Sequence, residues 1–99
     1  MSIVVILDCG ATNVRAIAVN NQGDIVASHH LRNETVQSIA QPVQHVWDFQ
    51  QIWNKLAQCC QKVTAQINTQ DICAVSVTTF GVDGAPFDAT GKQIYPIIS

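Results

Sequence analysis

Apolar and polar positions along the first third of the chain predict three consecutive strands. Runs rich in β-branched residues cover 3–8 and 14–20, and a short loop that contains Gly10 joins them, which is typical of a hairpin. Turn-forming residues at 20–23 then lead into a third apolar run at 24–31. The opening of the chain therefore predicts an antiparallel meander.

The middle of the chain changes to a helical pattern. Residues 35–46 contain Pro42 and show no sustained period, so we predict a loop there. Beyond Trp47, apolar residues recur at spacings of three and four, which places them on one stripe of a helix that ends around Ile67. Trp47 and Trp53 flank the helix start and are expected to be core or staple residues rather than a platform on which a sugar stacks. The stripe consists of Ile52, Leu56, Cys59, Cys60, Val63 and Ile67.

The start of this helix carries recognisable capping chemistry. Asp48 is the expected N-cap, and Gln51 three residues later completes a capping-box pattern. Trp47, just before the cap, is expected to pack on Ile52 as a hydrophobic staple. These residues predict a helix that begins near Phe49.

The last third returns to strand patterns. Residues 72–78 are β-branched and apolar, and because they follow a helix we predict a buried strand beside the first ones. A loop at 79–84 leaves that strand, and residues 85–88 and 92–95 predict a second hairpin. The chain then stops on apolar residues with no helix to cover the far side of the sheet, so we expect Ser99 to be a boundary within a longer protein.

Composition limits the classes of function. The chain has 99 residues, 47% of them hydrophobic and 12% charged, with a net charge of −2. This composition suits one globular domain and lacks the excess of basic residues that is typical of proteins that bind nucleic acid or acidic membranes. The first apolar run is too short for a signal peptide or a membrane span. The four cysteines (Cys9, Cys59, Cys60 and Cys73) lack Cys-x-x-Cys spacing, which favours free thiols and a cytoplasmic protein.

The loop after the first strand has the residue types of a phosphate site. A tight turn exposes successive N–H groups to an anion, and Gly10 permits close approach, while Thr12 and Asn13 add short polar side chains. Asp8 can hold Mg²⁺ directly or through water, and Arg15 can bind a transferring phosphoryl group. The same residues also suit an ordinary Asp-x-Gly turn with a solvated arginine. The loop lacks the Gly-Lys-Ser/Thr of a Walker A motif.

A resemblance decides between these interpretations. Residues 8–15, Asp-Cys-Gly-Ala-Thr-Asn-Val-Arg, resemble the Asp-x-Gly-x-Thr-x-x-Arg phosphate motif of the actin-like ATPase fold in carbohydrate kinases of the FGGY family. The run 74–84, followed by Asp88, Gly91 and 95–99, strengthens the resemblance, which covers the whole chain but only a minor, N-terminal part of a two-domain kinase. It implies an α/β domain of the actin-like ATPase (ribonuclease H-like) type, in which a mixed sheet with at least one packed helix carries the phosphate hairpin at one edge.

The resemblance also implies roles for individual residues. Asp8 is expected near Mg²⁺ and the phosphates of ATP, and Arg15 is expected to face the γ-phosphate. The residues expected to line the phosphate turn are Gly10, Thr12 and Asn13. The catalytic-base aspartate, the second phosphate motif and the adenosine pocket of the family fall downstream of this chain. Residues 1–99 are therefore expected to contain no catalytic residue and to be inactive alone.

The loop after the 72–78 strand is the expected sugar site, formed by Phe80, Gly81, Val82 and Asp83. Related kinases carry sugar-contacting side chains at the positions of Gly81 and Val82, Arg-Glu in glycerol kinases and Met-His in xylulokinases, whereas here neither position has a polar side chain. A glycine leaves open space, and Phe80 and Val82 offer apolar contact, which suits a 6-deoxy ketose. Two alternatives stay open: Gly81 with Gly84 can simply permit a turn above a core phenylalanine, and Asp83 can cap that turn instead of binding a sugar hydroxyl.

The function implied is Mg²⁺- and ATP-dependent phosphorylation of a ketose, with L-fuculose at O1 as the first expectation and L-rhamnulose or another ketose as the alternative. The expected partners are the sugar and the remainder of the kinase chain, with no nucleic acid and no membrane. A non-catalytic binding or assembly module, which pairs through its apolar end with another copy, is the rival outside catalysis. Oligomeric state and nucleotide preference stay open.

Overall fold

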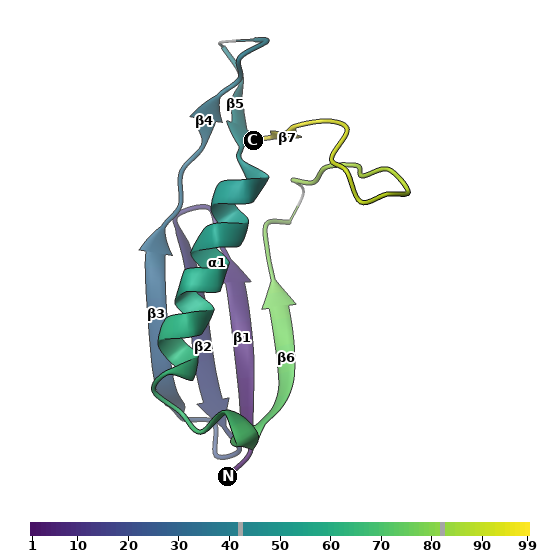
Figure 1. Ribbon diagram of the computed structural model, residues 1–99. Helices are drawn as coiled ribbons and strands as arrows, with labels where there is room; N and C mark the ends of the chain where they lie inside the picture. Colours follow the sequence, from purple (N-terminus) through teal and green to yellow (C-terminus); the bar gives the residue numbers. More distant parts are fainter. Residues whose placement is uncertain (42, 82) are drawn as a thin grey trace.

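A four-stranded mixed sheet with a helix on one face forms the body of the molecule (Figure 1). The computed structural model describes residues 1–41, 43–81 and 83–99. In the strand order β3-β2-β1-β6, the first three strands are antiparallel and β6 is parallel to β1. The predicted meander and the fourth strand beside it are confirmed. The strand bounds are β1 Ile3–Cys9, β2 Asn13–Asn20, β3 Ile25–Arg32 and β6 Ile72–Thr78.

A second, small sheet lies beyond one end of the first (Figure 1). It consists of β4 (Val36–Gln37), β5 (His45–Trp47) and β7 (Ile97–Ile98), all antiparallel. The prediction of a loop over 35–46 is therefore wrong at both ends of that range. Strands of two or three residues are too short to show a period, and β7 joins them from the far end of the chain. Pro42 lies outside the described residues.

Helix α1 (Phe49–Thr64) begins as predicted and ends three residues earlier. The Asp48 carboxylate accepts a hydrogen bond from the backbone N–H of Gln51 at 3.2 Å, which confirms the N-cap. The chain then turns through a 3-10 segment, η1 (Thr69–Asp71), into β6. Ile67 lies in the turn after the helix and still packs against the core. Its spacing from Val63 therefore matched the helical pattern although it lies outside the helix.

Two clusters of buried side chains hold α1 to the sheet. α1 lies mainly over β2 and β3 (Figure 1), where alanines on those strands allow close packing. The first cluster consists of Ile3, Val5, Ala16, Ala18, Ala27, Cys59 and Val63. The second, nearer the small sheet, consists of Cys9, Val14, Trp47, Ile52 and Ile97. Because Trp47 and Ile52 share a cluster, the packing expected of the staple is confirmed.

Strand β6 departs from its predicted burial. Val75 and Val77 are 61% and 64% exposed, although their register places them beside the helix-facing residues Val5 and Leu7 of β1. Because α1 covers β2 and β3, this side of β6 has no cover among the described residues. The apolar composition correctly predicted a strand, but it could not tell which element, if any, lies over it.

Two further predictions need correction. The β1–β2 hairpin lies at the centre of the sheet, not at one edge, because β6 adds to the free side of β1. The hairpin predicted at 85–95 is reduced to one bridge between Phe87 and Gln93. Its turn is closed by the Asp88 carboxylate, and hydrogen bonds from Thr90 and from the backbone N–H of Lys92 lower the pKa of Asp88.

Candidate phosphate and sugar site

The turn between β1 and β2 is tight and depends on glycine. The backbone N–H of Gly10 donates to the carbonyl of Asn13 at 2.9 Å. A Cβ at residue 10 would lie 3.0 Å from that same carbonyl oxygen, closer than side chains normally approach. Gly10 is therefore required by the close approach of two backbone segments.

The outer part of this turn presents free hydrogen-bond donors. Ala11 and Thr12 are exposed, and their backbone N–H groups have no acceptor among the described residues. The side chains of Thr12 and Asn13 are exposed at the same place. Consecutive unpaired N–H groups in a turn form a concavity that suits an anion such as phosphate.

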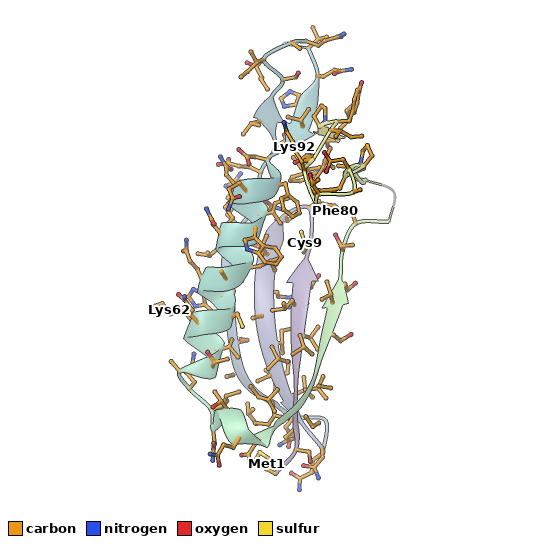
Figure 2. All side chains as sticks on the ribbon, turned by 45° about the vertical axis from the view of Figure 1, so that its right-hand side comes forward. Met1, Cys9, Lys62, Phe80 and Lys92 are labelled. Carbon is orange, nitrogen blue, oxygen red and sulfur yellow. The ribbon has the colours of Figure 1, made fainter. Side chains whose placement is uncertain are left out.

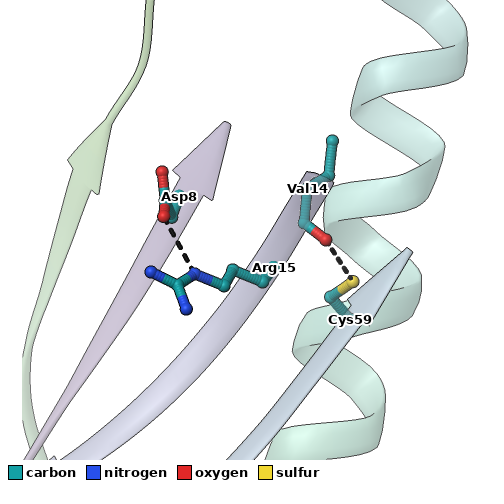
Figure 3. A network of polar contacts seen from close by, with 4 residues as sticks. All are labelled: Asp8, Val14, Arg15 and Cys59. Atoms are coloured by element: carbon teal, nitrogen blue, oxygen red, sulfur yellow. Dashed lines mark hydrogen bonds and ion pairs between the residues drawn. The ribbon is translucent and has the colours of Figure 1, made fainter. Parts of the chain in front are cut away.

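Asp8 and Arg15 are brought together beside this turn (Figure 3). They face each other across β1 and β2, and Arg15 Nε lies 2.9 Å from Asp8 Oδ2. Their side chains are 27% and 50% exposed. An ion pair with this exposure contributes only about 0–1 kcal/mol, so it gives way readily to a ligand. The prediction that Arg15 faces a phosphate stays a prediction, because here the guanidinium contacts Asp8.

The Asp8–Arg15 pair lies on the side of the sheet that faces away from α1. Side chains alternate along β2, and the side chain of the neighbouring residue, Val14, is buried in one cluster with Ile52 of α1. The backbone carbonyl of Val14 also accepts a hydrogen bond from the Cys59 thiol of α1 at 3.6 Å (Figure 3). The helix therefore supports the strands of the turn from behind. The charged groups stay open to solvent on the other side.

Asn33 is a residue of the site that sequence reasoning missed. It follows β3 directly and is 4% exposed. Its side-chain Nδ2 donates to the carbonyl of Gly10 at 3.0 Å, and its backbone N–H donates to the carbonyl of Thr12 at 2.9 Å. The only signal in the sequence is an asparagine at a strand end, and nothing local shows that it reaches a turn more than twenty positions earlier.

Two residues of the expected sugar loop, Phe80 and Asp83, are held by Trp47. Phe80 stacks on the Trp47 ring with centroids 4.7 Å apart, and the indole Nε1–H donates to Asp83 Oδ2 at 2.7 Å. Asp83 therefore anchors its loop to β5, a contact that neither open alternative included. Gly81 has open space at its Cβ position. Val82 lies outside the described residues.

A largely apolar cavity of about 300 Å³ adjoins this loop. Cys9 and Phe80 both line it, and both lie well away from Met1 (Figure 2). Trp53 lines the cavity and is 59% exposed, so the core or staple placement predicted for both tryptophans is right only for Trp47. The side chains that line the cavity include Phe49, Trp53, Leu56, Val77, Thr79, Phe80, Asp83 and Phe87.

Two of the four cysteines are buried thiols. All four are free, and burial raises the pKa of the Cys9 and Cys59 thiols, so both are protonated at neutral pH. Among residues 1–41, 43–81 and 83–99, no group of three or more histidine, cysteine or acidic side chains is placed to hold a metal. Nor does this part of the chain contain a helix with the length and apolarity to cross a membrane.

The fold assigns the chain to a class. Solved structures of sugar kinases share its arrangement, and they have the actin-like ATPase fold. Xylulose kinase from Lactobacillus acidophilus superposes with a TM-score of 0.82 at 17% identity, over 100% of this chain and 20% of that one. Plasmodium falciparum glycerol kinase with ADP gives a TM-score of 0.74 at 19% identity, and the match covers 99% of this chain and 20% of that one. The expected α/β fold with a mixed sheet is confirmed.

The chain belongs to the FGGY family of carbohydrate kinases, because the family's N-terminal domain matches residues 3–99. It is similar to the L-fuculokinase of Haemophilus influenzae, with 53% identity over 100% of this chain and 22% of that protein. The L-fuculokinase of Escherichia coli K12 is 44% identical over 98% of this chain and 21% of that protein. A glycerol kinase of Coxiella burnetii is 30% identical over 98% of this chain and 20% of that protein. The chain thus spans about a fifth of the length of these curated relatives.

Proposed function

We propose that this chain is the N-terminal portion of the first domain of an ATP-dependent kinase, and that the kinase phosphorylates L-fuculose at O1. Its 53% identity with an L-fuculokinase along the whole chain carries the proposal. L-Rhamnulose and other ketoses are the alternative substrates, and the catalytic base and the adenosine pocket belong to the remainder of the kinase. Four free thiols suit a cytoplasmic setting.

The phosphate end of the reaction is assigned to the β1–β2 turn. The free N–H groups of Ala11 and Thr12 bind phosphate oxygens, and Arg15 leaves Asp8 to contact the γ-phosphate. One Asp8 oxygen accepts from Arg15, and the other has no partner among the described residues. A single free carboxylate oxygen fits Mg²⁺, which is commonly held by one or two carboxylates together with substrate phosphates. An ion held by Asp8 would supply positive charge beside the phosphates.

The sugar end is assigned to the loop at 80–83. Asp83 Oδ1 has no partner among the described residues and accepts a hydrogen bond from a sugar hydroxyl. The open space at Gly81 admits the ketose, and Phe80 and Val82 contact its methyl end.

The substrate is tested with the full-length kinase in a coupled ADP assay. L-Fuculose, L-rhamnulose, D-xylulose and glycerol are compared at equal MgATP. We expect kcat/KM for L-fuculose to exceed that for each competitor by about tenfold or more. ADP release that no sugar stimulates, together with concentration-dependent self-association, would favour the assembly module instead.

Substituting arginine at Gly81 is expected to raise KM for L-fuculose by on the order of tenfold, because the new side chain fills the space left for the sugar. The fold should tolerate Gly81→Arg, since no atom lies within 4 Å of the Cβ position. KM is measured by the coupled assay. Ala89→Arg adds the same charge at an exposed turn position and should leave KM unchanged. Equal KM values for Gly81→Arg and the parent would contradict the assigned sugar site.

A further inference from the structure

Asn33 is a buried polar residue whose side chain serves neither strand pairing nor helix capping. At 4% exposure it is the buried polar residue of the described chain, and its side-chain amide nitrogen, side-chain oxygen and backbone N–H are each hydrogen-bonded. Nδ2 donates to Gly10, the backbone N–H donates to Thr12, and Oδ1 accepts from the backbone N–H of Glu34. Burying a polar side chain costs free energy unless its hydrogen bonds are made.

Its two long-range bonds act on the two carbonyls that flank the free donors of the turn. The Gly10 and Thr12 carbonyls both point to Asn33, on the inner side of the turn. Each peptide unit is planar, with its N–H opposite its C=O. Fixing the Gly10 carbonyl therefore sets the direction of the Ala11 N–H, which shares its peptide plane. Fixing the Thr12 carbonyl holds the peptide plane that follows Thr12, so the plane that carries the Thr12 N–H is held between two fixed neighbours.

We propose that Asn33 is a positioning residue for phosphate binding, which holds the Gly10–Thr12 turn with its N–H groups directed at the phosphates of MgATP. The inference rests on the proposed function, because it requires this turn to bind nucleotide. A turn that is already ordered before binding loses less conformational entropy when the phosphates arrive. Asn33 thereby acts on nucleotide affinity without contacting the nucleotide.

The test uses the full-length kinase and MgATP titrated by calorimetry. Asn33→Leu keeps the volume without polar atoms, and Asn33→Asp keeps the acceptor for Glu34 but removes the donor to Gly10. Both are expected to raise Kd for MgATP by on the order of tenfold, while KM for L-fuculose changes by less than about twofold. Equal Kd values for both variants and the parent would overturn the proposal.

A matched control separates positioning from general stability. Asn20 also braces a turn, since its side chain accepts from the backbone N–H groups of Gln22 and Asp24, but it lies at the opposite end of β2. Asn20→Leu is expected to lower the unfolding midpoint and to leave Kd for MgATP unchanged. An equal rise of Kd in Asn20→Leu and Asn33→Leu would mean that lost stability alone weakens binding.

A measurement on the unsubstituted kinase covers the case in which the Asn33 variants fail to fold. MgATP should shift the amide resonances of Ala11 and Thr12 and the side-chain amide of Asn33 together, and leave those of Gln22 unmoved. Unshifted Asn33 signals alongside shifted Ala11 and Thr12 would overturn the proposal. If the kinase binds MgATP but phosphorylates no ketose, the substrate assignment fails and the positioning role stands; if it does not bind MgATP, both fail.

Discussion

Replacing Asp8 with alanine in the full-length kinase is expected to lower kcat for L-fuculose by on the order of a hundredfold or more. The substitution removes the carboxylate proposed to hold Mg²⁺ beside the phosphates. Folding should survive, because Asp8 is partly exposed and its pair with Arg15 lies at the surface. Rates are measured by the coupled assay at saturating L-fuculose, with circular dichroism to check the fold.

Two companion variants sharpen this prediction. Asp8→Asn keeps an oxygen that can accept from Arg15 but removes the negative charge, and it should lose nearly as much activity as the alanine variant. Asp24→Ala removes an exposed carboxylate from the far end of the hairpin and should keep the parent rate. A parent-like rate in Asp8→Ala would remove the basis for the phosphate site.

Replacing Trp47 with alanine is expected to lower the free energy of unfolding by about 3–5 kcal/mol. Trp47 is 5% exposed within the second core cluster. Its loss leaves a cavity, removes the stacking of Phe80 and leaves the part-buried Asp83 carboxylate without its indole donor. A domain of this size is stable by only about 5–15 kcal/mol, so the loss is a large share of the total.

The measurement is urea unfolding of the 99-residue chain followed by circular dichroism. Trp53→Ala is the matched control, because the same side chain is removed from a position that is 59% exposed. Within the described part of the chain its ring stacks on Phe49 alone, with centroids 6.1 Å apart, and the variant should lose about 1 kcal/mol or less. Equal losses at the two positions would show that Trp47 does not anchor the sugar loop.

Local sequence signals predicted the parts of the fold that depend on near neighbours. The apolar runs of the hairpin and the Asp48 cap involve residues only a few positions apart, so periodicity and residue type were sufficient. The short strands β4, β5 and β7 were missed because two or three residues give no period. The burial of β6 was predicted wrongly because burial depends on which element lies over a strand, and the sequence of the strand alone does not determine that element.

The candidate site shows the same division. Asp8, Gly10 and Arg15 were found because they belong to one continuous motif, and the structure brings Asp8 and Arg15 into contact. The residues that hold the two loops were not found. Asn33 reaches Gly10 over 23 positions, and Trp47 reaches Asp83 over 36, so neither contact leaves a pattern in the local sequence.

The two outer strands of the main sheet, β3 and β6, differ in their ionisable side chains. β3 carries two histidines and an arginine along its length, whereas β6 carries no ionisable side chain except Cys73. Charged and polar side chains discourage a further strand from pairing, while an uncharged, β-branched edge invites it. Of the two edges, β6 is therefore the more favourable one for a further strand.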